Sequence, residues 1–238
     1  NENIEYIFYD GTTWSTPMPL DSANIFATHA SLAIDSNDNL HVTYYDQTNT
    51  NLEYMMYDGD SWSSSLTLDS ADTVGWDSSL VIDSNDNLHV TYFDYTNYAL
   101  KYVTFSGSNW SIPVTLDDDG AVGMEPCLTI DSNDSLHVTY YDGDNQNLKY
   151  MTTNTATSAW GNAITLEGGG NTGMYSSIAV DSNDNLHVTY MAKPQNQNEY
   201  NLIYKTHNLF GWSNPLTLDN SGNVGWYSSI AIDSNDHL

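Results

Sequence analysis

Ten residues with chemically useful side chains stand as five pairs at the same place in five copies of a repeat. The frame around them hardly changes, whereas the pairs differ from copy to copy. Apolar and aromatic faces combined with a few polar groups suit a neutral polar ligand such as a sugar. We therefore predict a ligand-binding site composed of Thr28, His29, Trp76, Asp77, Met124, Glu125, Met174, Tyr175, Trp226 and Tyr227.

Two carboxylates of this set, Asp77 and Glu125, also raise the question of catalysis. Glycosidases place a pair of carboxyl groups on either side of the bond that they cleave. The chain has no arginine to clamp a carboxylated substrate, which argues against sialidase-like or uronate chemistry. It also lacks nucleophile-elbow, phosphate-loop and zinc-site motifs. We expect no catalytic residue and keep a glycan-cleaving enzyme as the less favoured alternative.

The recurring Asp-Ser-Asn-Asp-Asn segment suggests calcium as a candidate metal. Its first copy has oxygen-bearing side chains at EF-hand spacing, at Asp35, Asn37, Asn39 and Asp46. The sixth position, which requires glycine in an EF-hand, is Leu40. The residues after it read as a strand, which carries Asp46 about 20 Å from Asp35. We predict an Asx-stabilised hairpin turn, no metal ligand and no cofactor, with loop-bound calcium as the alternative.

Other recurring side chains have structural interpretations. One histidine per repeat begins a strand, and the repeats hold these histidines too far apart to share a metal ion, so each is expected to be hydrogen-bonded. The recurring tryptophans and tyrosines are expected to pack in the core and between repeats. The single cysteine, Cys127, cannot form an internal disulfide and is expected to be a small buried residue. The histidines are His41, His89, His137 and His187.

All these positions depend on a repeat whose most regular stretch is Ile34–Tyr44. It returns almost letter for letter at 82–92, 130–140 and 180–190, and a fifth copy begins at Ile232. The copies start 48, 48, 50 and 52 residues apart. A period of this size indicates a solenoid, a propeller or an array.

Each repeat contains four short strands separated by polar turns, and no stretch has sustained helical periodicity. Four strands in about 48 residues are typical of a propeller blade. We predict an all-β, five-bladed β-propeller. From the central axis outward, each blade should contain a Ser-Leu-Val-Ile strand, a His-Val-Thr-Tyr strand, a Leu-x-Tyr strand and a strand that begins with tryptophan. The paired residues then lie at the mouth of the central channel, where they can also simply plug the channel or pack between blades.

The two ends of the chain are expected to share one composite blade. About eight residues of its second strand are missing. A gap in the blade, a longer repeat array and a strand from a neighbouring chain are all compatible with this. We predict a single domain, 1–238, with repeats at 1–27 plus 228–238, 28–75, 76–123, 124–173 and 174–227.

The repeats resemble extracellular β-propeller repeats of bacterial and archaeal proteins, whose unit is similar to Val224–Leu238. The Asp-Ser-Asn-Asp turn is similar to that of NHL-type blades. The blade count and period resemble tachylectin-type lectins, which carry one sugar site per repeat. This resemblance implies an extracellular or cell-surface protein. The sugar contacts of the tachylectins are not transferred, because only a Gly-Trp before the innermost strand matches their motif.

Charge narrows the possible partners. The chain has 31 acidic residues and four lysines, for a net charge of −27. Nucleic acid is excluded as a partner and an anionic membrane is disfavoured, because both require clustered Lys and Arg. We predict a non-catalytic extracellular recognition module that binds a glycan or other neutral polar ligand through top-face loops. The alternative is a structural unit of a surface layer, filament or longer array that self-assembles through the incomplete composite blade.

Overall fold

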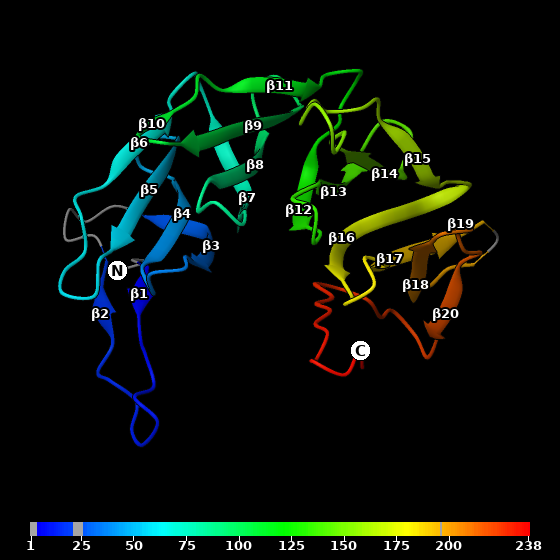
Figure 1. Ribbon diagram of the computed structural model, residues 1–238. Coiled ribbons are helices and arrows are strands. Elements are labelled where there is room, and N and C mark those ends of the chain that lie inside the picture. Colours follow the sequence, from blue (N-terminus) through cyan, green and yellow to red (C-terminus); the bar gives the residue numbers. More distant parts are fainter. Residues whose placement is uncertain (1–3, 21–25, 196) are drawn as a thin grey trace.

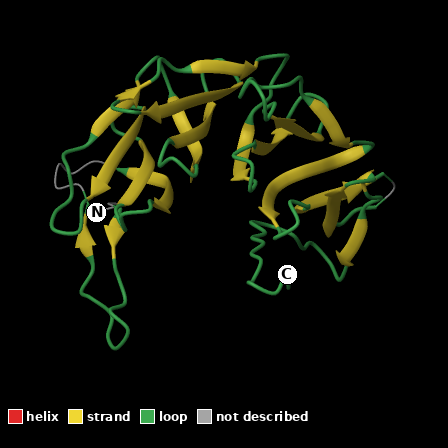
Figure 2. Ribbon diagram, viewed as in Figure 1, coloured by secondary structure: helices red, strands yellow, loops and turns green. Residues whose placement is uncertain are grey.

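The computed structural model describes residues 4–20, 26–195 and 197–238. These residues form 20 β-strands and no helix (Figure 2), so the predicted all-β class is confirmed. Four antiparallel sheets follow one another in an arc, and the first strand of each lies on the inner side of the arc (Figure 1). The strands of each sheet follow in chain order from the inside outward, as predicted.

Each of the four sheets is one blade. The first contains β3 (Ala27–Ile34), β4 (Leu40–Asp46), β5 (Asn51–Tyr57) and β6 (Leu66–Asp69). The second contains β7 (Val74–Ile82), β8 (Leu88–Asp94), β9 (Ala99–Ser106), β10 (Asn109–Trp110) and β11 (Val114–Asp117). The third contains β12 (Met124–Ile130), β13 (Leu136–Asp142), β14 (Asn147–Thr152) and β15 (Ile164–Glu167). The fourth contains β16 (Gly170–Val180), β17 (Leu186–Pro194), β18 (Asn201–Asn208), β19 (Gly211–Trp212) and β20 (Leu216–Asp219).

The outermost strand differs from the prediction, because it is broken after its tryptophan. In the second blade, β10 and β11 pair separately with β9, and β19 and β20 do the same with β18. In the first and third blades the tryptophan forms only an isolated bridge. Pro113 and Pro215 lie in the breaks of the second and fourth blades, and proline has no N–H to donate to a neighbouring strand.

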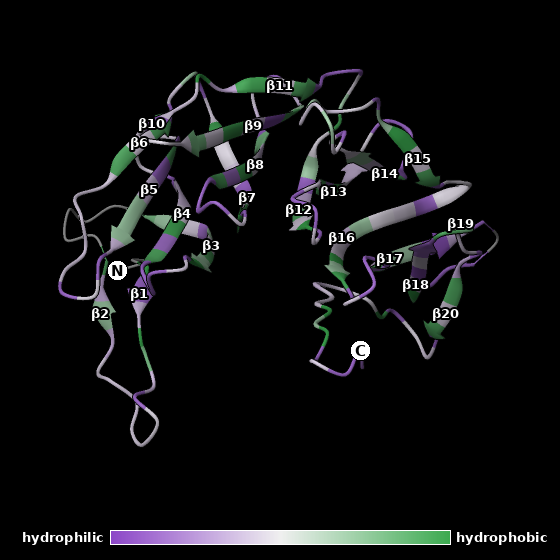
Figure 3. Ribbon diagram, in the orientation of Figure 1, coloured by the Kyte–Doolittle hydropathy of each residue, from purple (hydrophilic) through white to green (hydrophobic). Residues whose placement is uncertain are grey.

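The core consists of hydrophobic side chains within and between blades. Tyr44, Tyr92, Tyr140 and Tyr190 stand at one position of the second strand and are at most 1% exposed. Tyrosines of the third strand pack edge-on against the tryptophan of the next blade, with ring centroids 4.9 Å apart for Tyr54 and Trp110 and 5.4 Å apart for Tyr102 and Trp160. The predicted packing role is confirmed for these aromatic residues, whereas Trp14, the equivalent tryptophan of the first repeat, is 66% exposed. Figure 3 shows strands rich in hydrophobic residues joined by hydrophilic turns.

Glycine allows neighbouring blades to approach closely. Gly75 and Gly173 lie in the innermost strands of two blades with φ of 100° and 102°. A Cβ atom at Gly75 would lie 2.7 Å from Cα of Leu52 in the preceding blade, and one at Gly173 would lie 2.5 Å from Cα of Leu148. Any other residue would therefore combine a strained backbone with a steric clash.

The Asp-Ser-Asn-Asp turns have the predicted hydrogen bonds. Oδ1 of Asp35 accepts the N–H groups of Asn37 and Asn39 at 2.9 and 2.8 Å. His41 is hydrogen-bonded as predicted, because its Nδ1 lies 2.7 Å from the Tyr54 hydroxyl and its Nε2 lies 3.3 Å from the Asp35 carboxylate. The Asp35 carboxylate is therefore occupied by the turn and its histidine.

The same turns also clamp one blade to the next, which was not predicted. Ser84 donates its N–H and its hydroxyl to the two carboxylate oxygens of Asp134, at 2.9 and 2.6 Å. The clamp recurs at Ser36–Asp86, Ser132–Asp184 and Ser182–Asp236.

Three of the four lysines form buried ion pairs between blades. Nζ of Lys101 lies 2.5 Å from Oδ2 of Asp69, which also accepts the Tyr92 hydroxyl at 2.7 Å. Burial opposes ionisation of Asp69, but the hydrogen bonds from Lys101 and Tyr92 outweigh it and hold the pKa of this carboxyl below its usual value. The other two pairs are Lys149–Asp117 and Lys205–Glu167.

The fifth repeat is divided between two separate segments. β1 (Glu5–Tyr6) and β2 (Met18–Pro19) form a sheet of their own, and Tyr6 packs edge-on against Trp62 of the first blade. Residues 228–238 lie against the fourth blade, where the N–H of Ile230 donates to Oγ of Ser177 at 3.1 Å. No described residue after 219 belongs to a strand. The composite blade expected from the sequence is therefore not closed in this structure, and none of the described residues fills the second-strand position between its halves.

Candidate ligand-binding site

Four of the predicted pairs stand at equivalent bends of the innermost strands, and the fifth, Trp226 and Tyr227, has the same place in its repeat but lies outside any strand. The register of β3 against β4 shifts between Thr28 and Ser31, and β7, β12 and β16 show the same shift. The second residue of each pair has a left-handed backbone, which is uncommon for residues other than glycine. Bulges of this kind redirect a side chain and cluster near functional sites. The φ values are 53° for His29, 51° for Asp77, 52° for Glu125, 53° for Tyr175 and 50° for Tyr227.

One cavity of about 590 Å³ lies where these bends converge. All five left-handed residues line it, together with one first member of a pair, Trp76. The remaining predicted residues, Thr28, Met124, Met174 and Trp226, are not among the described residues that line it. Thr28, Met124 and Met174 pair with residues of the second strand, as Trp76 does, but of these four only Trp76 reaches the cavity.

Small side chains that the sequence analysis missed complete the lining. They occupy the two positions after each pair, so their constant place in the repeat could have identified them as lining residues. Several serines there join blades, as when the Ser78 hydroxyl lies 3.0 Å from that of Thr43. Cys127 also lines the cavity and is half-buried, and burial raises the pKa of its thiol. The set is Ala30, Ser78, Pro126, Cys127, Ser176, Ser177 and Ser228.

One sector of the cavity is acidic. Nδ1 of His29 lies 2.5 Å from Oδ1 of Asp77, and this hydrogen bond raises the pKa of His29. Burial raises the pKa of Glu125 to about 7, and the charge of Asp77 acts in the same direction. A carboxyl group with such a pKa can donate or accept a proton near neutrality, and it can also accept hydrogen bonds from a hydroxylated ligand.

An adjoining sector of the cavity is aromatic. The rings of Tyr175 and Tyr227 are 4.2 Å apart at their centroids and inclined by 43°, and Trp226 lies 5.4 Å from Tyr175. Burial, the Tyr227 hydroxyl and the charge of Glu125 raise the pKa of Tyr175 to about 12. Tyr227 is 77% exposed, so its ring is open to a ligand. The N–H of Tyr175 donates to Oε2 of Glu125 at 2.5 Å and so links the two sectors.

Trp76 forms a third part of the wall. Its ring stacks on His29 with centroids 5.3 Å apart and on Tyr95 with centroids 5.2 Å apart. Its indole nitrogen is buried and has no hydrogen-bond partner among the described residues. Trp76 thus combines packing with exposure to the cavity, which the sequence could not distinguish.

No lysine is among the described residues that line the cavity, and arginine is absent from the chain. Within the described ranges, no group of three or more His, Cys, Asp and Glu side chains is arranged to hold a metal ion. The same ranges contain no helix with the length and apolar character needed to span a bilayer. The cavity therefore combines two carboxyl groups, a histidine and aromatic rings.

Comparison with known proteins reveals structural likeness only. No protein-family model and no curated protein sequence matches the chain. Its structure is similar to that of the Aleuria aurantia lectin in complex with α-methyl-L-fucoside, with a TM-score of 0.63 and 14% identity over 94% of this chain and 73% of the lectin. The fold is a β-propeller, as predicted. The five-blade count rests on the repeats in the sequence, since four complete blades are present among the described residues.

Two enzymes show a comparable likeness. A polysaccharide lyase, an ulvan lyase bound to a GlcA–Rha3S unit, matches with a TM-score of 0.63 and 13% identity over 89% of this chain. The GH93 α-L-arabinofuranosidase of Fusarium graminearum, in complex with arabinobiose, matches with a TM-score of 0.58 and 15% identity over 83% of this chain. The chain spans 64% of the lyase and 68% of the arabinofuranosidase. At these identities the likeness establishes the propeller fold alone.

Proposed function

We propose that this propeller is a non-catalytic, extracellular recognition module that binds a glycan at the mouth of its central cavity. The proposal rests on one observation above all. A single cavity combines an exposed aromatic wall, Tyr175 and Tyr227, with hydrogen-bonding groups on Asp77 and Glu125. Sugars present apolar C–H faces and hydroxyl groups, and such a wall with a few polar groups accommodates both.

The structural neighbours support this proposal as fold-level analogy. The lectin was solved with a fucoside, and the lyase and the arabinofuranosidase were solved with oligosaccharides. The propeller architecture is therefore used for glycan binding both with and without catalysis. Fold alone does not establish either activity for this chain, and the residues of its cavity are what favour glycan binding.

Binding to a glycan panel tests the proposal. Tyr227→Ala removes a side chain that lines the cavity and is 77% exposed, so it should not unfold the protein. We expect it to weaken binding of the best panel glycan about tenfold, as loss of an aromatic contact does. Trp14→Ala is the matched control, because Trp14 is 66% exposed and does not line the cavity. Unchanged affinity in Tyr227→Ala, or equal loss in Trp14→Ala, would refute this site.

Catalysis would use the same cavity. The carboxyl group of Glu125, with its pKa of about 7, is the feature that would suit a general acid. On our proposal the unaltered protein binds polysaccharides and releases no products. Turnover that disappears in both Asp77→Asn and Glu125→Gln would replace the binding function with glycan cleavage.

A second candidate function, an assembly unit, is favoured by the open face of the first blade. Leu32 is 54% exposed there, whereas the equivalent Leu80 and Leu128 of the next two blades are 5% and 4% exposed. Ile34 is 59% exposed on the same strand. In each of the other blades, the equivalent residues are covered by the blade that precedes it. We infer that a second copy can supply the covering blade, with its residues 228–238 against β3.

Sedimentation velocity tests this assembly. A concentration-dependent increase in mass is expected, and Leu32→Glu should abolish it because a buried charge opposes docking. Leu209→Glu is the control, since Leu209 is 99% exposed in a loop of the fourth blade. A strictly monomeric particle at high concentration, or equal effects of the two variants, would exclude assembly through this face.

A further inference from the structure

We propose that the ligand carries a protonated amino group, as in a glycan with unacetylated hexosamine units, and that this group binds between the carboxyl group of Glu125 and the rings of Tyr175 and Tyr227. This inference rests on the proposed glycan-binding function and specifies its ligand. It refines the neutral ligand expected from the sequence to a positively charged one. The reasons are the charges of the cavity and the composition of its wall.

The charges of the lining residues leave one carboxyl group without a counter-charge. Asp77 is paired with His29 at 2.5 Å. Among the described residues, Glu125 accepts a hydrogen bond only from the neutral N–H of Tyr175. The lysines are committed elsewhere, since three form buried ion pairs between blades and Nζ of Lys193 lies 5.6 Å from the ring centroid of Tyr200. An anionic sugar would meet Glu125 without any basic residue beside it, whereas an ammonium group supplies the missing charge.

The aromatic wall favours the same class of ligand. Tyrosine and tryptophan rings attract cations through their faces, and sites for ammonium groups often combine such rings with a carboxylate. Tyr175 and Tyr227 stand next to Glu125, and Trp76 stands beside Asp77 in the same cavity. A sugar can therefore stack on a tyrosine ring while its amino group contacts Glu125.

Titratable groups in the cavity should make the affinity for the ligand depend on pH. Burial and the charge of Asp77 raise the pKa of Glu125 to about 7, so a bound cation must favour its ionised form. The other titratable groups facing the cavity are His29, Asp77, Tyr175, Tyr227 and Cys127. His29 has a raised pKa and loses its charge as the pH rises, which makes the cavity more negative still. The complex needs an ionised Glu125 and a protonated amine, so affinity for the amino sugar should be highest near pH 7 and fall on either side of it.

Calorimetry with three oligosaccharides of equal length and linkage tests the proposal. The probes are β-1,4-linked oligomers of glucosamine, of N-acetylglucosamine and of glucose. We expect the glucosamine oligomer to bind about tenfold more tightly than the other two at neutral pH and low salt. Glu125→Gln should remove this preference, so that the glucosamine and glucose oligomers bind to the variant with equal affinity.

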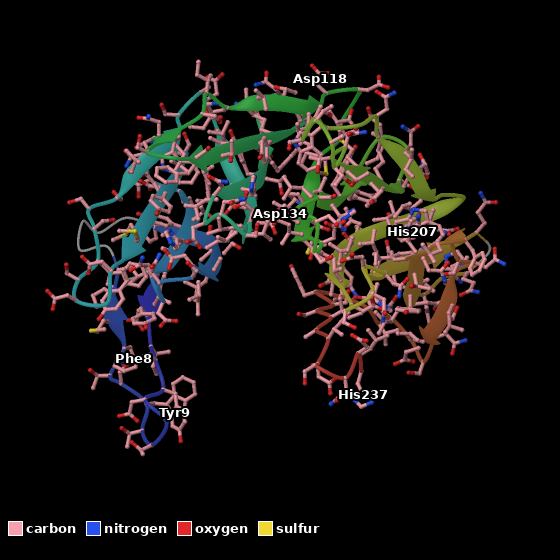
Figure 4. All side chains as sticks on the ribbon, viewed as in Figure 1. Phe8, Tyr9, Asp118, Asp134, His207 and His237 are labelled. Atoms are coloured by element: carbon pink, nitrogen blue, oxygen red, sulfur yellow. The ribbon has the colours of Figure 1, made fainter. Side chains whose placement is uncertain are left out.

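Two controls separate the site from general attraction to a protein with a net charge of −27. Asp118→Asn removes one negative charge from an exposed residue on the outer rim of the arc (Figure 4) and should retain the full preference. Thermal unfolding of Glu125→Gln must show a folded protein. A preference lost equally in Asp118→Asn and Glu125→Gln would overturn the inference.

The remaining outcomes distinguish the inference from the function on which it rests. Equal affinity for all three oligomers, with loss of binding in Tyr227→Ala, would overturn the amino-group proposal and leave glycan binding intact. Binding of none of the oligomers and of nothing in a broad glycan panel would overturn both. Tight binding of the glucosamine oligomer that Glu125→Gln retains would assign its recognition to groups other than Glu125.

Discussion

Nδ1 of His29 lies 2.5 Å from Oδ1 of Asp77, and this contact joins the first blade to the second at the mouth of the central cavity. Both residues occupy the same position of their repeats, and both have a left-handed backbone. An interaction between equivalent positions of neighbouring blades requires strands that converge on one axis. It also makes the cavity asymmetric, because the other repeats place Glu125, Tyr175 and Tyr227 there.

The His29–Asp77 pair should make stability depend on pH. The hydrogen bond to Asp77 raises the pKa of His29 above its unfolded value of about 6.5. Its stabilising contribution is therefore fully present below about pH 6.5 and is lost as the pH rises through the higher folded pKa. We expect His29→Ala to remove this part of the pH dependence of the unfolding free energy, measured by denaturant titration. Asp77→Asn should remove the same part, and a retained slope in either variant would contradict the assignment.

The close approach of blades at glycine predicts a large loss of stability in Gly173→Ala. The added Cβ would lie 2.5 Å from Cα of Leu148 at a φ of 102°. We expect a loss of more than about 3 kcal/mol, since both backbone strain and overpacking contribute. Gly59→Ala is the control, because Gly59 has a φ of 94° but an added Cβ there would meet nothing within 4 Å. Gly59→Ala should lower the unfolding free energy by only about 1 kcal/mol. Equal losses in the two variants would show that backbone strain alone accounts for the loss of stability.

The clamp between turns predicts different effects for two equivalent aspartates. Asp134 accepts two hydrogen bonds from Ser84 of the preceding blade, whereas no described residue donates to the carboxylate of the equivalent Asp38. Both aspartates have left-handed backbones, with φ of 59° and 63°, so alanine imposes the same backbone strain at each. Asp134→Ala should therefore cost about 1 kcal/mol more than Asp38→Ala. Equal unfolding free energies for the two variants would mean that the clamp adds nothing to stability. Figure 4 shows Asp134 on the inner side of the arc.

Cys127 offers a reporter of ligand binding, because it is the single cysteine of the chain and lines the cavity. Burial raises the pKa of its thiol, so alkylation by iodoacetamide should be slower in the folded protein than in denaturant at the same pH. A saturating glucosamine oligomer should slow the reaction further by covering the thiol. An alkylation rate that saturating ligand does not change would place the bound ligand away from this part of the cavity.

The paired residues show which parts of the candidate site could be predicted from the sequence. The repeat identified all five places that converge on the cavity, because variation within a constant frame indicates positions released from packing. It did not indicate which member of each pair faces the axis. Trp76 and Asp77 both line the cavity, whereas only Glu125 of the Met124–Glu125 pair does so. That choice depends on a bulge in the pairing of two strands, and alternation along one strand cannot reveal it.

The sequence by itself determined the features that depend on short-range patterns. Four strands per repeat, their order within a blade, the Asx turns and the packing of the recurring tyrosines and tryptophans all follow from alternation, turn residues and the period. The tertiary structure alone decided the polar contacts between repeats. The Ser84–Asp134 clamp and the Lys101–Asp69 pair join residues 50 and 32 positions apart. Such partners become neighbours only when the blades turn about a common axis, because each contact depends on the angle and distance between two separately formed sheets.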